Sequence, residues 1–235
     1  MKREMLQRLV AAWRRNRPSV LVRGLTSGSQ LLVDEMTVHG DKANVPDELL
    51  QHAREILRRD GAVTLEIAGE RYLLQTLSSP PRLIIVGAVH IAQVLIPMAR
   101  IAGYKVKLID PRSAFASPER FPDTDIITEW PLDALQELSP DSRTAIITLS
   151  HDAKIDDPAL QSALESEAFY IGALGSKKNH TNRLKRLAEH GFSDAALARI
   201  AGPIGLPLGG RSPAEIAVSI LAQIIQSRYR KPGKL

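Results

Sequence analysis

The sequence predicts an α/β protein with a C-terminal, doubly wound, Rossmann-like parallel sheet preceded by a small α+β domain. From residue 83 onward, short apolar runs alternate with helical patterns, which is the order of a parallel sheet with crossover helices. The run over 83–86 is continuously apolar, as expected of a strand that is buried on both faces. Before residue 79 the pattern is less regular, with Gly, Ser and Pro in the turns.

The N-terminal elements follow from residue periodicity and from the residues that interrupt it. Pro18 ends the first helical pattern, Pro46 and Gly61 bracket the second, and Gly69 marks a hairpin turn. In chain order, the expected elements are a helix over 2–15, strands over 19–23 and 30–33, a helix over 47–59 and a hairpin over 62–77.

A linker is predicted where Ser78-Ser-Pro-Pro81 interrupts the pattern, because two prolines continue neither a ladder nor a helix. The expected domains are therefore a small α+β domain over 1–78, a linker over 79–82, a Rossmann-like domain over 83–229 and a basic tail over 230–235.

The C-terminal elements alternate in type. The expected strands are 83–86, 105–109, 125–128, 144–149 and 169–174, and the expected helices are 90–102, 132–138, 158–167, 179–189 and 213–228. The last helix carries Ser212 as its N-cap and Glu215 three residues later, which is the capping-box spacing.

Composition excludes several classes of function. The 235 residues contain no cysteine, so disulfides, thiolate metal sites and a cysteine nucleophile are excluded, and a cytoplasmic location is the expectation. No apolar run approaches the roughly 20 residues of a membrane span. The net charge is +5, but aromatic residues make up only 4%, so the sequence does not predict nucleic-acid binding.

Polar and glycine residues gather where the predicted parallel strands end. Ligands of such sheets bind beyond the carboxyl ends of the strands, so these residues are the candidate site. They are Gly87 and His90 after the first strand, Asp110 and Arg112 after the second, His151 after the fourth, and Gly172, Gly175, Ser176 and Lys177 around the end of the fifth.

The first strand end is a degraded dinucleotide-binding motif. Gly87-Ala-Val89 places a β-branched residue where the fingerprint has its second glycine, and Val89 is expected to intrude there and to tolerate positive φ poorly. Asp110 follows at about the position of a ribose-binding acid. NAD(P) binding therefore stays open as an alternative to a turn that binds no dinucleotide.

The fifth strand end is the better candidate for an anion. Gly172 and Gly175 permit unusual backbone angles, Ser176 can cap the next helix, and Lys177 adds positive charge. A plain capped turn with a solvated lysine is the alternative. No metal site is expected, because His90 and His151 lack cysteine partners and a clear third ligand.

From Pro81 to the end, the chain resembles the xanthine dehydrogenase accessory factor family (XdhC/CoxI). The resemblance rests on Ile85-Val-Gly-Ala-Val-His-Ile-Ala92, Asp110-Pro-Arg112, Phe115-Ala116, Arg120-Phe-Pro122, Ser150-His-Asp152, Tyr170-Ile-Gly-Ala-Leu-Gly-Ser-Lys177, Pro203-Ile-Gly-Leu206 and Pro213-Ala-Glu-Ile-Ala-Val-Ser-Ile220. Family members read Gly-Ala-Gly-His at the first block, where this chain has Val89. The N-terminal part resembles the family's small domain only faintly, through Gly28-Ser-Gln-Leu-Leu-Val33.

The resemblance implies a maturation chaperone rather than an enzyme. Such a protein binds the molybdenum cofactor (molybdopterin), supports its sulfuration by a cysteine desulfurase, and supports its insertion into an apo molybdenum hydroxylase of the xanthine or carbon monoxide dehydrogenase type. The nine candidate residues would then bind this cargo, and a homodimer is expected. Two alternatives remain: an NAD(P)-dependent oxidoreductase, and a ligand-free docking protein that bridges the desulfurase and its client.

Overall fold

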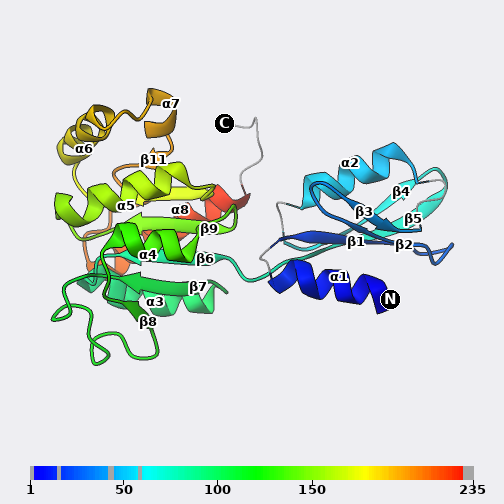
Figure 1. Ribbon diagram of the computed structural model, residues 1–235, viewed down its shortest axis with the longest axis horizontal. Helices are drawn as coiled ribbons and strands as arrows, with labels where there is room; N and C mark the ends of the chain where they lie inside the picture. Colours follow the sequence, from blue (N-terminus) through cyan, green and yellow to red (C-terminus); the bar gives the residue numbers. More distant parts are fainter. Residues whose placement is uncertain (1–2, 15–16, 42–44, 58–59, 230–235) are drawn as a thin grey trace. The chain divides into compact units, whose positions relative to one another are not determined.

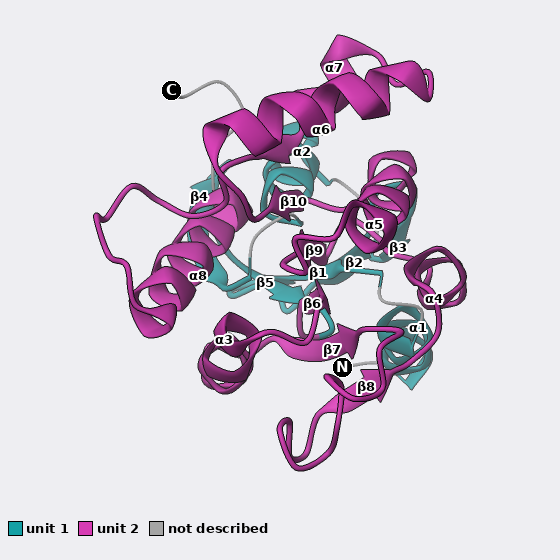
Figure 2. Ribbon diagram, turned by 90° about the vertical axis from the view of Figure 1, so that its left-hand side faces the viewer, with its two compact units in different colours: residues 1–79 teal, residues 80–235 magenta. Residues whose placement is uncertain are grey.

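The computed structural model describes residues 3–14, 17–41, 45–57 and 60–229. The chain forms two compact units, Met1–Ser79 (unit 1) and Pro80–Leu235 (unit 2), which are coloured separately in Figure 2. The basic tail expected over 230–235 lies outside the described residues. No helix within the described ranges combines the length and the apolar character that a membrane crossing requires.

Unit 1 is an antiparallel sheet with the strand order β3-β2-β1-β5-β4 and one helix on each face (Figure 1). Its elements are α1 (Arg3–Arg14), β1 (Ser19–Gly24), β2 (Gln30–Val33), β3 (Val38–Gly40), α2 (Asp47–Ile56), β4 (Ala62–Ile67) and β5 (Glu70–Leu77). The side chains of β1 alternate between the two helices: Val20 and Val22 belong to the core under α2, and Leu21 packs with Met5 of α1. The sequence did not predict β3, which is only three residues long.

Unit 2 contains a six-stranded parallel sheet with the order β11-β10-β9-β6-β7-β8. Its strands are β6 (Arg82–Val86), β7 (Lys105–Ile109), β8 (Asp125–Ile127), β9 (Thr144–Thr148), β10 (Tyr170–Ala173) and β11 (Ile200–Ala201). The chain runs outward from β6 through β7 to β8, then returns to the other side of β6 and continues from β9 to β11. The direction therefore reverses between β6 and β9, where doubly wound sheets bind their ligands.

Helices cover both faces of this sheet. They are α3 (His90–Ile101), α4 (Pro131–Leu138), α5 (Ala153–Glu165), α6 (Lys177–Glu189), α7 (Asp194–Leu197) and α8 (Pro213–Tyr229). One hydrophobic core lies between the sheet and helices α3 and α8. A second core lies between the opposite face of the sheet and helices α4, α5, α6 and α7, as the view along the strands in Figure 2 shows. Ile84 and Ile85 belong to different cores and are both fully buried, which explains why β6 is apolar without alternation.

The start of α5 was predicted wrongly from the residue pattern, and the start of α8 was predicted correctly. The prediction for α5 was wrong, because it took Pro158 as the start, whereas the helix begins at Ala153 with Pro158 inside it. The side chain of Asp152 caps this helix by accepting the N–H of Lys154 at 2.9 Å. The capping box of α8 is confirmed, since Ser212 and Glu215 exchange hydrogen bonds at 2.9 and 3.3 Å.

Candidate functional site

The carboxyl ends of β6 and β9 approach each other closely at Gly87. This glycine has φ +113°, and a Cβ added to it would lie 2.6 Å from the backbone nitrogen of Ser150. A side chain at this position would therefore meet backbone, and the backbone angle would also be strained. Gly87 is required for the chain to turn from β6 into α3 beside β9, whether or not a ligand binds there.

Asp110 fastens this turn from the end of β7. Its carboxylate accepts the backbone N–H of Ala88 at 2.8 Å, and it accepts the backbone N–H, Nε and Nη2 of Arg112 at 3.0, 2.9 and 2.8 Å. Asp110 is 0% exposed. Burial alone would raise its pKa, but the hydrogen bonds from Arg112 and Ala88 hold the pKa of Asp110 below its usual value. Both carboxylate oxygens are thus committed within the protein, which leaves Asp110 unsuited to bind a ribose.

Arg120 fastens the same turn from the segment after β7. Its Nη1 donates to the carbonyl of Ala88 at 3.1 Å and also to that of Phe115, so both backbone polar groups of Ala88 are bound by side chains. Gln93 links the backbone carbonyl of Arg120 to His90, with distances of 3.2 and 3.0 Å. Arg120 was not among the candidate residues, although it lies in a block that carries the family resemblance.

Val89 does not strain the turn. Its φ is −100° and its ψ is 172°, an extended conformation that β-branched residues adopt readily. The N–H groups of Gly87, Ala88 and Val89 are all bound within the protein, to Ile109, Asp110 and Gly87 respectively. These three N–H groups are therefore not available to a pyrophosphate, whereas the N–H groups of residues 90–92, at the start of α3, have no described hydrogen bond.

Arg112 extends from the end of β7 toward the charges at the end of β9. Its side chain is 32% exposed, and its Cζ atom lies 4.6 Å from the ring centroid of Phe115. The hydrogen bond to Asp110 raises the pKa of Arg112, and the charges of Asp152 and Asp156 add to this effect. Arg112 therefore remains charged, and its side chain is partly exposed.

The end of β9 is held by a buried carboxylate. Ser150 donates its hydroxyl to Asp156 Oδ1 at 2.6 Å, and Arg183 Nη2 lies 3.5 Å from Asp156 Oδ2. Burial raises the pKa of Asp156 and lowers that of Arg183. His151, the candidate in this turn, is exposed and has φ +62°. Sequence reasoning missed Asp156 and Arg183; the one signal is that Arg183 shares a helical face with Leu187.

The turn after β10 presents unused donors at the start of α6. Ser176 caps the helix by accepting the N–H of Asn179 at 3.2 Å, and Gly175 has φ +149°. None of the described hydrogen bonds uses the backbone N–H of the four successive residues 175–178. Successive free N–H groups at a helix start form a concave anion site, and the exposed Lys177 adds charge to it.

Gly172 serves packing rather than ligand approach. A Cβ added to it would lie 2.6 Å from Ile204 Cδ1 and 2.8 Å from the ring of Tyr170. The nine candidate residues therefore fall into two groups, those that the fold itself requires and those that are available to a ligand. Gly87, Asp110 and Gly172 are committed to the fold, whereas His90, Arg112, His151, Gly175, Ser176 and Lys177 lie at strand-end turns.

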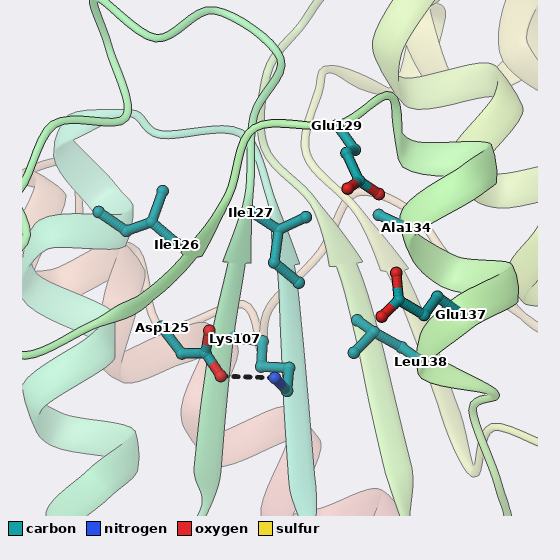
Figure 3. A pocket seen from close by; sticks show the side chains of 8 residues that line it. All are labelled: Lys107, Asp125, Ile126, Ile127, Glu129, Ala134, Glu137 and Leu138. Carbon is teal, nitrogen blue, oxygen red and sulfur yellow. Dashed lines mark hydrogen bonds and ion pairs between the residues drawn. The ribbon is translucent and has the colours of Figure 1, made fainter.

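A separate hollow of about 300 Å³ runs along β7, β8 and α4 (Figure 3). Its polar lining comprises the carboxylates of Asp125, Glu129 and Glu137, together with Lys107, which pairs with Asp125. The excess of negative charge makes this hollow unfavourable for a phosphate-bearing ligand. Within the described ranges, no three His, Cys, Asp or Glu side chains are grouped to hold a metal ion.

The strand order and the strand-end turns define unit 2 as a Rossmann-type domain. Residues 83–224 match the family profile described as the XdhC Rossmann domain, and the chain belongs to the XdhC family. In the crystal structure of a xanthine dehydrogenase from Bacillus halodurans, the similar region covers 96% of this chain and 66% of that one, with 25% identity and a TM-score of 0.73.

Two curated relatives are also similar. The chain is 37% identical over 109 residues to the molybdenum cofactor insertion chaperone PaoD of Escherichia coli, which covers 46% of this chain and 34% of PaoD. It is 32% identical over 201 residues to a probable xanthine dehydrogenase subunit from Bacillus subtilis, which covers 83% of this chain and 57% of that protein. The matched regions thus span about a third to just over half of these relatives.

Proposed function

We propose that the chain is an accessory protein that binds the molybdenum cofactor and supports its insertion into a molybdenum hydroxylase. The observation that carries this proposal is the row of four unused N–H groups over residues 175–178, at the carboxyl end of β10. The similarity to a protein named as a molybdenum cofactor insertion chaperone supports the choice of cargo. Molybdopterin bears a terminal phosphate, which is the group that such a turn binds.

The phosphate would be held by backbone and side chains together. Ser176 Oγ accepts the N–H of Asn179, so its own hydroxyl hydrogen can be donated to a phosphate oxygen. Lys177, in the first turn of α6, is exposed and can approach the same oxygens. This arrangement combines charge with several short hydrogen bonds, the usual composition of a phosphate site.

The pterin end of the cargo would lie toward the turns after β6, β7 and β9. Arg112 offers a partly exposed planar guanidinium, and such groups stack on ring systems and bind oxygens in pairs. His90 and His151, which are both exposed, would contact the pterin or the oxygens bound to molybdenum. Asp110 would act indirectly, because it fixes the direction of Arg112.

The partners in this proposal are a cysteine desulfurase and an apo molybdenum hydroxylase. None of the 235 residues is a cysteine, so the chain has no thiol on which to carry persulfide sulfur. Sulfuration of bound cargo would therefore need direct transfer from the desulfurase. The chain would protect the cofactor during that step and would then release it to the client enzyme.

The geometry argues against nicotinamide cofactor binding as the main function. Asp110 has no free oxygen for a ribose, and the N–H groups of Gly87, Ala88 and Val89 are already bonded within the protein. Titration with NADH, followed by its fluorescence, should give no saturable signal at micromolar concentrations. Saturable binding in that range would favour the oxidoreductase alternative.

Client activation tests the proposed function with a matched pair of variants. An apo molybdenum hydroxylase is mixed with released cofactor, with or without the chain, and the activity recovered by the client is measured. Lys177→Ala should reduce the gain, whereas Lys185→Ala, which removes an exposed charge farther along α6, should not. An equal gain with both variants would contradict the assignment of Lys177. A wild-type chain that gives no gain would contradict the proposed function.

A further inference from the structure

Arg183 of α6 is a buried cation whose hydrogen-bonding capacity is only partly used. It is 5% exposed. Its Nη2 donates to the carbonyl of Leu174 at 2.9 Å, but its Nε and Nη1 have no hydrogen-bond partner in the described part of the chain. Buried polar groups are nearly always paired, so the unpaired donors of Arg183 leave part of a buried positive charge uncompensated.

The guanidinium of Arg183 lies beneath the turn that precedes α6. Helical side chains point back toward the N-terminus of their helix, so a long side chain two turns into α6 reaches the helix start. A Cβ added to Gly175 would lie 3.8 Å from Arg183 Nη1 and 3.9 Å from Nη2. The unused backbone donors of residues 175–178 and the unused side-chain donors of Arg183 thus belong to one small region.

The negative charge opposite Arg183 does not fully compensate it. Asp156 is only 1% exposed, it binds Ser150 through Oδ1, and its Oδ2 lies 3.5 Å from Arg183 without a hydrogen bond. A buried arginine whose carboxylate partner lies 3.5 Å away without a hydrogen bond projects part of its positive potential through the surrounding low-dielectric interior.

A neighbouring pair between the same two helices shows the difference. Arg186 Nε and Nη2 donate to the two carboxylate oxygens of Asp157 at 2.6 and 3.0 Å. That geometry is bidentate, so the charge of Arg186 is satisfied within the protein. The two pairs therefore provide a matched comparison, in which only the Arg183–Asp156 pair leaves donors and charge unused.

We propose that Arg183 is the buried half of an anion site whose exposed half is the turn over residues 175–178, and that this site takes a phosphate group. The inference rests on the proposed function for the identity of the natural ligand, since the phosphate would be that of the bound cargo. Free inorganic phosphate carries the same chemistry and serves as the probe. Arg183 is a positioning residue here: it sets the potential at the turn, and the backbone N–H groups contact the anion.

The test compares two variants that should change phosphate binding in opposite directions. Wild type, Arg183→Lys and Asp156→Asn are titrated with inorganic phosphate by calorimetry at constant ionic strength. Arg183→Lys should weaken phosphate binding about tenfold, because the shorter lysine holds its charge farther from the turn. Asp156→Asn should strengthen binding, because Arg183 loses its opposing charge while Ser150 keeps an acceptor. Arg186→Lys and Asp157→Asn should each change the dissociation constant less than about twofold.

If the Arg183–Asp156 pair had only a structural role, both variants would bind phosphate more weakly than wild type. Weaker phosphate binding by Asp156→Asn therefore overturns the inference. Wild type without detectable phosphate binding also overturns it. An NMR titration of the wild type, which decides the matter even where a variant does not fold, should shift the Arg183 Nε–H signal and leave that of Arg186 in place. The reverse pattern contradicts the inference. The chain could also bind phosphate in a way that depends on Arg183 and yet retain no molybdopterin. That pair of results would contradict the proposed function and leave the phosphate site supported.

Discussion

The carboxylate of Asp110, at the end of β7, accepts the backbone N–H of Ala88, at the end of β6, with a distance of 2.8 Å. A residue at the position of a ribose-binding acid thus serves as an internal brace between two strand ends. Arg120 completes the brace by donating to the carbonyl of the same Ala88. The Rossmann-type turn of this chain is therefore fixed by side chains, and the longer row of unused N–H groups, over residues 175–178, lies at the end of β10.

Replacing Asp110 should destabilise the fold. Asp110→Ala leaves the N–H of Ala88 buried without a partner and frees Arg112, so we expect a loss of roughly 2–4 kcal/mol in the free energy of unfolding. Urea denaturation measures this loss. Asp125→Asn, which removes an exposed pair with Lys107, should cost less than about 1 kcal/mol. Equal losses for the two variants would contradict the role of Asp110.

The same carboxylate should make stability depend on pH. The folded pKa of Asp110 lies below its unfolded value, so its contribution is present above the unfolded pKa of about 3.9 and is lost as the pH falls through the folded pKa. The difference in unfolding free energy between wild type and Asp110→Asn should be constant near neutrality and should shrink below about pH 4. A difference that grows as the pH falls would reverse the sign of this prediction.

Two glycines with positive φ provide a test of the close approach between β6 and β9. Gly87→Ala brings a Cβ to within 2.6 Å of backbone, whereas Gly103→Ala, with φ +87°, meets nothing within 4 Å. We expect Gly103→Ala to lose about 1 kcal/mol from strain alone, and Gly87→Ala to lose at least roughly 3 kcal/mol. Thermal denaturation of both variants ranks them. Similar melting temperatures would mean that the backbone contact at Gly87 yields easily.

Val89 should prove compatible with its position. It packs against the core under α3 and supplies no side-chain cap. We expect Val89→Gly to lose about 1–2 kcal/mol in the free energy of unfolding, because it removes packing and adds unfolded-state entropy. It should not create NADH binding, because Asp110 still holds the N–H of Ala88. NADH binding by this variant, measured by fluorescence, would show that Val89 alone blocks a dinucleotide.

Local patterns determine how far the fold is predictable. The apolar run of β6 and the turn at Gly87 indicate a buried parallel strand and its helix crossover directly. Pro158 misleads, because proline is favoured at helix starts and the true start depends on the cap at Asp152. β11 contains only two residues, too few for a residue pattern to reveal.

The site is less predictable than the fold because its charges are paired across elements. Ser176 and Lys177 stand out in the sequence as candidates because a cap and a charge follow a strand directly. Arg183 and Asp156 lie on different helices, and only packing shows that both are buried and imperfectly paired. Asp110 was identifiable as a notable acid, but its role depends on the backbone of another strand end.

Retention of cargo is the most direct test of the proposed function. The chain is purified without oxygen from cells that make abundant molybdenum cofactor, and molybdenum and released pterin are each measured per mole of protein. The proposal predicts both in a fixed ratio to protein, with less of each after Lys177→Ala and an unchanged amount after Lys185→Ala. Protein that retains neither molybdenum nor pterin would contradict the proposal.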